Sequence, residues 1–234
     1  MTREEYLSAL RETYRVVHVL ADRNGCRTLH LRHREKGRDM VLHSLPQPVV
    51  AYEMLCGISC AALPVIYDVI ELEDGQIVLE EYIDGISVER MLECSPYTYH
   101  EAKKLVASVC DALSVLHANG LVHRDVKPSN VMLEQGGRVV LVDFNIARQV
   151  SGRKTRDTVV MGTVGYVSPE QLGVAQSDAR TDIYAVGVLL NVLLTGKHPS
   201  ECLAKGRAGR IVRKCTAVSP SDRYQTVEKL KQAL

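Results

Sequence analysis

The order of hydrophobic and polar positions changes its period near residue 84. Before that point, apolar and polar residues alternate in short runs, as strands with one buried face require. Turn residues at Asn24-Gly25 and Lys36-Gly37 separate the first runs, which favours antiparallel hairpins. The pattern predicts strands over 14–20, 27–32, 38–45, 65–71 and 76–82, a leading helix over 3–11 and a second helix over 48–59.

After Asp84-Gly85 the apolar positions recur at helical spacing instead. Helices are predicted over 87–93, 98–119, 181–195, 205–217 and 222–234. Strands followed by helices are typical of the α+β class. We therefore expect an N-terminal lobe over 1–83 and a C-terminal lobe over 84–234, which together form one domain.

Composition excludes several classes of partner. The 234 residues carry a formal net charge of +1, so charge gives no argument for nucleic acid or an anionic membrane. The most apolar stretch, 183–194, is shorter than the ~20 residues of a membrane span, and the N-terminus lacks the apolar region of a signal peptide. The seven cysteines form no Cys-x-x-Cys pair, and no second pair of ligands follows Cys56 and Cys60. Buried thiols in a reducing cytoplasm are the expectation.

Candidate chemistry lies at 123–130, which read His-Arg-Asp-Val-Lys-Pro-Ser-Asn, and at 143–145, which read Asp-Phe-Asn. The two segments combine a carboxylate that could accept a proton, a lysine and two oxygen ligands for a metal ion. Phosphoryl transfer needs such a set, because a hydroxyl must be oriented and phosphate charge must be neutralised. The alternative is a polar turn between two strands, in which Asp125 and Asn130 only cap the backbone.

These segments resemble the catalytic loop and the metal-binding loop of protein kinases, in the form typical of the Ser/Thr-directed branch. Residues 180–190 and 220–226 resemble the central helix and the closing motif of bacterial Ser/Thr kinases. The resemblance covers nearly the whole chain. It implies a bilobal kinase fold, with a five-stranded antiparallel sheet and one helix in the N-lobe and a mainly helical C-lobe.

The resemblance also implies roles for individual residues of the C-lobe. Asp125 would orient a substrate hydroxyl and accept its proton, and Lys127 would stabilise the charge of the moving phosphoryl group. Thr163 is expected to bridge these two side chains. Asn130 and Asp143 would hold Mg²⁺ beside the phosphates of ATP.

Further residues would support this site. Asp182 is expected to hold the backbone of the catalytic loop, and His123 to pack beside the metal-binding loop rather than act as a base. Arg124 would bind a phosphorylated activation segment, with an ordinary surface arginine as the alternative. Glu170 and Arg223 are expected to form an ion pair.

The segment from 143 to 170 resembles a kinase activation segment, with Ser168 in place of alanine before Pro169-Glu170. Thr155 and Thr158 lie among basic residues and are candidate phosphorylation sites. A basic loop that is never phosphorylated is the alternative reading.

The N-lobe departs from the kinase pattern. Ala21, Arg23 and Cys26 stand where kinases have three glycines that let backbone amides approach phosphates. His43 stands where kinases have the lysine that binds the α- and β-phosphates. Glu53 occupies the position of that lysine's partner, and we expect it to pair with His43 only when the imidazole is protonated.

The expected adenine site follows from the same resemblance. Main-chain atoms of Glu81 and Ile83 would bind the base. Leu20, Val41 and Met132 would enclose its ring. Glu80 falls at the gatekeeper position, where a charge needs a partner.

Two departures concern the C-lobe. Asn145 replaces the glycine of the Asp-Phe-Gly motif, and we expect it to keep the loop's shape because asparagine tolerates left-handed dihedral angles. The few residues between Gly196 and the next predicted helix imply that the usual substrate-docking helix of kinases is shortened or absent.

Two function classes stay open. The first is a weak ATP-dependent Ser/Thr protein kinase that acts on a protein substrate in the cytoplasm, with a homodimer for trans-phosphorylation as a further partner. The second is a pseudokinase, which senses nucleotide or acts as a scaffold. A small-molecule phosphotransferase is disfavoured, because Thr163 and 168–170 resemble the loop that faces protein substrates.

Overall fold

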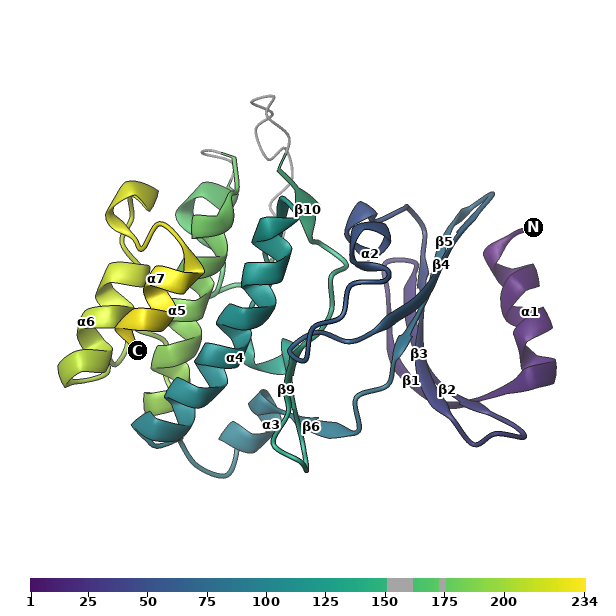
Figure 1. Ribbon diagram of the computed structural model, residues 1–234, viewed down its shortest axis with the longest axis horizontal. Coiled ribbons are helices and arrows are strands. Elements are labelled where there is room, and N and C mark those ends of the chain that lie inside the picture. Colours follow the sequence, from purple (N-terminus) through teal and green to yellow (C-terminus); the bar gives the residue numbers. More distant parts are fainter. Residues whose placement is uncertain (151–161, 173–175) are drawn as a thin grey trace. The chain divides into compact units, whose positions relative to one another are not determined.

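The computed structural model describes residues 1–150, 162–172 and 176–234, and it divides the chain into two compact units (Figure 1). Unit 1 comprises 1–60 and 64–83, and unit 2 comprises 61–63 and 84–234. Unit 1 carries a five-stranded sheet and unit 2 is mainly helical, so the fold is α+β and kinase-like. The candidate phosphorylation sites Thr155 and Thr158 lie outside the described residues.

Unit 1 is built on an antiparallel sheet with the strand order β1-β2-β3-β5-β4. Its strands are β1 (Tyr14–Arg23), β2 (Cys26–His33), β3 (Asp39–Leu45), β4 (Ile66–Leu72) and β5 (Gly75–Glu81). Its helices are α1 (Arg3–Thr13) and α2 (Val50–Leu55).

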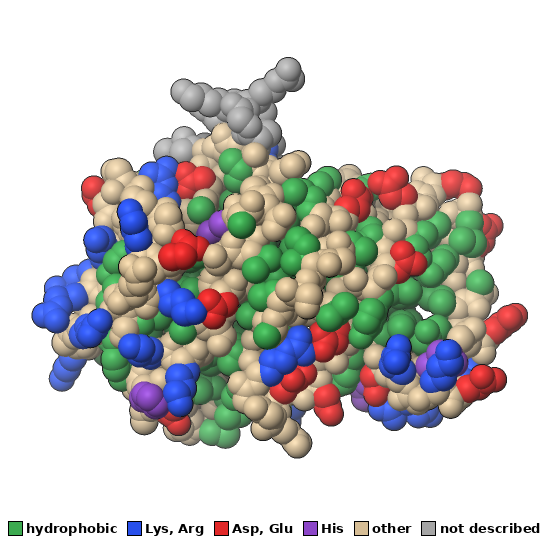
Figure 2. All heavy atoms as spheres, in the orientation of Figure 1, with side chains coloured by type: hydrophobic (Ala, Val, Ile, Leu, Met, Phe, Trp, Pro, Cys, Tyr) green, Lys and Arg blue, Asp and Glu red, His purple; other side chains and the backbone are tan. Residues whose placement is uncertain are grey.

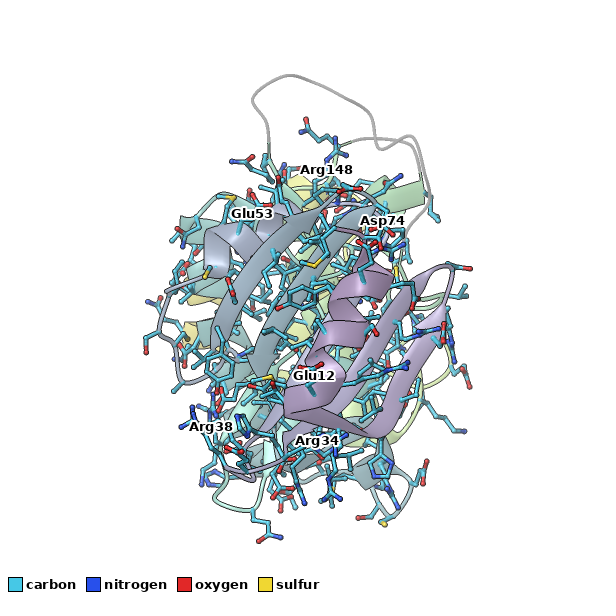
Figure 3. The ribbon with its side chains drawn as sticks, turned by 90° about the vertical axis from the view of Figure 1, so that its right-hand side faces the viewer. Glu12, Arg34, Arg38, Glu53, Asp74 and Arg148 are labelled. Atoms are coloured by element: carbon cyan, nitrogen blue, oxygen red, sulfur yellow. The ribbon has the colours of Figure 1, made fainter. Side chains whose placement is uncertain are left out.

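The two faces of this sheet carry different side chains. Leu31, Leu42 and Ile77 belong to a buried apolar cluster, against which Tyr6 and Leu10 of α1 pack. Figure 3 shows α1 crossing in front of the strands on this side. Because neighbouring residues of a strand point to opposite faces, the side chain after Leu42 points to the other face, where α2 lies. That side chain is the buried imidazole at the position of the kinase lysine.

The helix predicted over 48–59 is wrong in length, since α2 covers only Val50–Leu55. Cys56 already leaves the helical conformation (φ −59°, ψ 127°), and Gly57 has φ +80°, which ends the helix. The first helix is longer than predicted. Its N-terminus is held by a capping box between Thr2 and Glu5.

Unit 2 contains short strands and longer helices. The strands are β6 (Gly85–Ser87), β7 (Leu121–Val122), β8 (Val131–Glu134), β9 (Val139–Leu141) and β10 (Arg148–Gln149). The helices are α3 (Val88–Leu92), α4 (Tyr99–Ala118), α5 (Ala179–Thr195), α6 (Gly206–Cys215) and α7 (Val227–Ala233). Helix α5 packs against α4 and α6, and α7 packs against α4 (Figure 1).

The five short strands of unit 2 were not predicted, because runs of two to four residues are too short to show alternation. The last helix was predicted from 222, but it begins at Val227. Residues 220–222 form a single 3₁₀ turn after Pro220, and Thr226 caps the helix that follows. Residues 196–205 contain no helix, which confirms that the segment after α5 is short.

The expectation that the cysteines are mostly buried is wrong. Cys110 and Cys215 are buried, whereas Cys56, Cys94 and Cys202 are exposed, and all are free thiols. Desolvation raises the pKa of the Cys110 thiol to about 12. Within the described part of the chain, no helix is long and apolar enough to cross a membrane.

Candidate active site

Two pairs of short strands bring the candidate loops of unit 2 together. Strand β7 pairs with β10, and β8 pairs with β9. The loop 123–130 joins β7 to β8, and the loop 142–147 joins β9 to β10, so each loop starts and ends beside the other. A hydrogen bond of 2.9 Å from Val142 N to Asn130 O links them directly.

Asp125 lies at the centre of a hydrogen-bonded cluster. Its Oδ1 accepts the hydroxyl of Thr163 at 2.8 Å, and its Oδ2 lies 2.7 Å from the ammonium of Lys127. The same ammonium donates to the Thr163 hydroxyl at 2.6 Å. The expected bridge between Asp125 and Lys127 is therefore present. The side chain of Lys127 is one-fifth exposed, which keeps the cation within reach of a ligand.

The residues expected to hold Mg²⁺ supply a suitable but incomplete set of donors. Asn130 Nδ2 donates to Asp125 O at 2.9 Å and to Asp125 Oδ2 at 3.1 Å. Its Oδ1 accepts a long hydrogen bond of 3.5 Å from Ser129 Oγ and is the atom that would face a cation. Asp143 Oδ1 accepts from Asn145 N at 3.2 Å. Among the described residues, no group of three or more His, Cys, Asp or Glu side chains could hold a metal ion. Two hard oxygen ligands suit Mg²⁺ that is shared with phosphate oxygens and water.

Asp182 of α5 holds the start of the catalytic loop, as expected. Its carboxylate accepts the backbone amides of His123 at 3.0 Å and Arg124 at 2.8 Å, and it lies 2.8 Å from His117 Nε2. Asp182 is fully buried, and burial by itself raises the pKa of a carboxyl group. The His117 and backbone hydrogen bonds outweigh that effect and hold the pKa of Asp182 below its usual value.

Two residues of the site have a left-handed backbone without being glycine. They are Arg124 (φ 71°) and Asp143 (φ 69°). Such conformations cost free energy and gather where the surroundings enforce them, and here the amide of Arg124 is held by Asp182. The left-handed residue of this loop is Asp143 and not Asn145, so the expectation of a left-handed asparagine is wrong.

His123 and Arg124 are both buried. Nδ1 of His123 accepts the amide of Asp125 at 3.3 Å, and its ring meets Phe144 edge-on at 5.4 Å. This packing agrees with a structural role, and desolvation lowers the pKa of the imidazole. Arg124 is 7% exposed, so it is not an ordinary surface arginine. Its pairing with a phosphorylated segment stays a prediction.

Gln171 is a supporting residue that the sequence reasoning missed. Its Nε2 donates to Arg124 O at 3.0 Å, and its Oε1 accepts the amide of Ser168 at 3.0 Å and the Ser168 hydroxyl at 3.2 Å. Both side chains are buried. The available signal for this link was Ser168, which replaces the usual alanine three positions before Gln171.

The expected ion pair between Glu170 and Arg223 is present. The two side chains make two contacts, of 2.6 and 2.9 Å, and both are almost fully buried. Thr181 adds its hydroxyl to Glu170 at 2.9 Å. Although burial opposes ionisation, the guanidinium of Arg223 holds the pKa of Glu170 below its usual value. The pair ties the end of the 162–172 segment to the start of α5 and to the loop before α7.

In unit 1, His43 contacts Glu80 and not Glu53, with which a pair was expected only for a protonated imidazole. Nε2 of His43 lies 2.8 Å from Glu80 Oε1, and its Nδ1 lies 3.2 Å from the hydroxyl of Thr28. Both members of the His43–Glu80 pair are 5% exposed. Glu53 instead accepts a hydrogen bond from Gln76 at 2.9 Å.

Strand geometry explains this change of partner. Val41 lies directly opposite Glu80 on the neighbouring strand, so His43 is the diagonal neighbour of Glu80 on the same face of the sheet. The carboxylate of Glu80, at the gatekeeper position, therefore has its partner His43 within the sheet. The second oxygen of Glu80 is buried and has no hydrogen-bond partner in the described chain.

The segment that corresponds to the glycine-rich loop is a hairpin whose register shifts between Val19 and Ala21. Arg23 pairs directly with Cys26, and Asn24 (φ 52°) and Gly25 (φ 76°) form the two-residue turn between them. Arg27 forms an ion pair with Asp22 at 3.0 Å. Since both strands stay paired up to the turn, this hairpin lacks the open glycine backbone that cradles phosphates in kinases.

The residues expected to bind adenine are distributed over both units. In unit 1, Leu20 is 51% exposed, whereas Val41 and Ile83 are buried. The amide of Glu81 donates to Val65 O at 2.9 Å. In unit 2, Met132 lies on β8 opposite Ser87 of β6. Their contacts with a base stay predictions.

The sheet of unit 1, the helices of unit 2 and the Asp125 cluster together define the class. The chain belongs to the protein kinase domain family, whose model matches residues 51–233. It is similar to the probable serine/threonine-protein kinase PknB of Lactococcus lactis (35% identity over 136 residues) and to the serine/threonine-protein kinase PknB of Mycobacterium tuberculosis (38% over 146 residues). It is also similar to the serine/threonine-protein kinase PknL of Mycobacterium tuberculosis, with 39% identity over 142 residues.

These matches cover 57 to 59% of the chain and 22 to 35% of the relatives. The chain therefore corresponds to a minor part of each relative's length.

Proposed function

We propose that this chain is an ATP-dependent protein kinase of low activity that transfers the γ-phosphate to a serine or threonine hydroxyl of a protein. The observation that carries the proposal is the cluster of Asp125, Lys127 and Thr163. The carboxylate and the cation belong to the loop 123–130, whose first amides Asp182 accepts, and the hydroxyl of Thr163 lies 2.6 to 2.8 Å from both.

The residues of unit 2 supply most of the chemistry of this proposal. Asp125 accepts the proton of the substrate hydroxyl and keeps that oxygen aimed at the phosphorus atom. Lys127 stabilises the negative charge of the phosphoryl group during transfer. Asn130 and Asp143 would hold Mg²⁺, which neutralises phosphate charge when it is bound.

The low activity in this proposal follows from unit 1. His43 is engaged by Glu80 and Thr28, and the hairpin at Asn24-Gly25 has no glycine-rich loop. Because these features weaken the hold on ATP phosphates, they also support a second candidate function. In that case the chain is a pseudokinase that binds nucleotide or a protein partner without useful turnover.

The proposal extends to location and partners. ATP and Mg²⁺ are its cofactors, and the use of ATP favours the cytoplasm. A second copy of the chain is a substrate by the same chemistry, which would make phosphorylation in trans a route of activation.

A phosphotransfer assay distinguishes the two functions. The purified chain is incubated with Mg²⁺, γ-labelled ATP and a general protein substrate, and incorporated label is measured for wild type and Asp125→Asn. Loss of a general base costs about 10²–10⁴-fold in rate, so the variant should fall to background. Asp111→Asn, on the exposed side of α4, is the matched control and should keep the wild-type rate.

Label that is incorporated equally by wild type and Asp125→Asn would reject the assignment of Asp125. Background label in the wild type, together with measurable nucleotide binding, would favour the pseudokinase.

A further inference from the structure

The short connection between α5 and α6 leaves a pocket at the surface of unit 2. The pocket has a volume of about 410 Å³. It is lined by Tyr99 of α4, Leu194 and Thr195 of α5, residues 202–205 of the connection, and Arg207 and Ala208 of α6. Leu194, Leu203, Ala204 and Ala208 make its lining largely apolar.

This pocket is formed by a firmly held backbone. Asn191, which is fully buried in α5, donates to Lys197 O at 2.9 Å and to Cys202 O at 2.7 Å, and it accepts the amide of Ala204 at 2.8 Å. One side chain thus binds both ends of the connection. Gly209 lets α6 lie close to the backbone of the connection, because a Cβ atom at this position would lie 2.0 Å from Ala204 O. A preformed pocket of this kind loses little entropy when it binds a ligand.

The mouth of the pocket is positively charged. Lys205 and Arg207 belong to its lining and are exposed, and α6 continues with the exposed Arg210 and Arg213. None of these four cations forms a salt bridge within 1–150, 162–172 or 176–234. Figure 2 shows basic side chains gathered on the part of unit 2 where α6 lies.

We propose that this pocket is a docking site for a protein partner through a short peptide that carries an apolar side chain next to acidic residues. The apolar side chain enters between Leu194, Leu203 and Ala208, and the acidic residues face Lys205 and Arg207. Charge complementarity favours this occupant, since a cationic mouth beside an apolar pocket binds an acidic peptide better than a neutral or basic one. The site is distinct from the Asp125 cluster and does not depend on phosphotransfer.

The test begins with a random peptide library displayed on phage and selected on the purified chain. Enriched sequences should combine Leu, Ile, Phe or Met with Asp or Glu. A synthetic peptide of the enriched sequence, labelled with fluorescein, then gives affinities by anisotropy at 150 mM salt.

Two double variants with the same change in charge separate the pocket from general attraction. Lys205→Glu with Arg207→Glu should weaken binding by about tenfold or more, because charged contacts beside an apolar pocket are partly desolvated. Arg210→Glu with Arg213→Glu changes residues of the same helix outside the lining. That control should change affinity by about twofold or less, since exposed charges at a distance are screened by salt.

The cysteines provide a second readout that does not depend on substitution. Cys202 lines the pocket and is exposed, while Cys56 and Cys94 are exposed elsewhere. The peptide should slow alkylation of Cys202 by iodoacetamide and leave the other two thiols unchanged. Equal losses in the two double variants, no protection of Cys202, or enriched peptides without acidic residues would each overturn the proposal.

Discussion

At the scale of single residues, the pair of His43 and Glu80 determines whether unit 1 has a cation that can bind the phosphates of ATP. A lysine has the charge that a phosphate clamp needs, and His43 lacks it unless protonated. Yet the carboxylate of Glu80 lies 2.8 Å from the imidazole in a buried environment. A lysine at position 43 would meet the same carboxylate and form an ion pair with it. The missing clamp therefore results from two positions, not one.

We expect His43→Lys alone to raise phosphotransfer little, because Glu80 would hold the new ammonium. The double variant His43→Lys with Glu80→Leu should raise the rate by about tenfold or more, the scale of one charged contact to the reacting phosphate. Initial rates at saturating Mg²⁺ and ATP measure this, with Glu80→Leu alone as the control. A gain in the single lysine variant equal to that of the double variant would show that Glu80 does not compete.

Asp143 supports a second prediction at this scale. If its carboxylate holds Mg²⁺ beside the phosphates, the melting temperature of the wild type should rise more with Mg²⁺ and ATP than with ATP alone, by linkage. Asp143→Ala should remove that difference. Asp111→Asn, which changes an exposed carboxylate, should keep it. A difference that survives in Asp143→Ala would place the cation elsewhere.

At the scale of elements, the active site depends on short pieces that are joined by side chains. Asp182 of α5 binds the loop after β7, and Gln171 binds the same loop to the 162–172 segment. Glu170 and Arg223 fasten that segment to the region before α7. Because each contact joins elements that lie far apart in sequence, the loss of one contact should destabilise several elements of unit 2.

The Glu170–Arg223 pair predicts a stability that depends on pH. Removing one partner of a buried pair leaves the other charge uncompensated, so Glu170→Gln should lower the free energy of unfolding by about 3 kcal/mol at pH 7. The pKa of Glu170 is lowered in the folded state, so its contribution is present above the unfolded value of about 4.5 and is lost as the pH falls through the folded value. The difference in the free energy of unfolding between Glu170→Gln and the wild type should therefore disappear in acid.

Urea denaturation at pH 7 and at a series of pH values from 4.5 downward checks this expectation. Glu228→Gln, at the exposed start of α7, is a control that should cost much less at pH 7. A gap for Glu170→Gln that stays constant with pH would mean that the pair contributes through packing and not through charge.

At the scale of the whole molecule, the chain crosses between its two units more than once. Residues 61–63 belong to unit 2, although they lie between stretches of unit 1. Arg138 accounts for this, because it donates to Ala61 O at 2.8 Å and to Leu63 O at 3.0 Å. The amide of Leu141 on β9 also donates to Ala62 O, at 2.9 Å. We refer to residues 61–63 as the strap.

We expect Arg138→Gln to loosen the strap while the rest of unit 2 stays folded. The amide of Leu141 should then exchange with deuterium faster, because its acceptor is held less firmly. Amides in the middle of α4 serve as the internal reference and should exchange at the wild-type rate. Unchanged exchange at Leu141 would show that Ala62 is held without Arg138.

The sequence alone was enough to predict the α+β class, the five strands of unit 1 and the candidate residues Asp125, Lys127 and Asn130 of the catalytic loop. These follow from local information: alternating and helical periods, turn residues, and a motif whose members lie within eight positions. The bridge by Thr163 and the pairs made by Asp182 and Glu170 came from the family resemblance, since nothing in their own neighbourhoods indicates them.

Only the tertiary structure decided that His43 pairs with Glu80, that Asp143 takes the left-handed conformation, and that Gln171 joins two loops. The same holds for the pocket beside α6 and for the strap at 61–63. Each depends on which side chains meet across strands and helices distant in sequence. Register, burial and backbone approach settle such contacts, and none of these is encoded in a short window of residues.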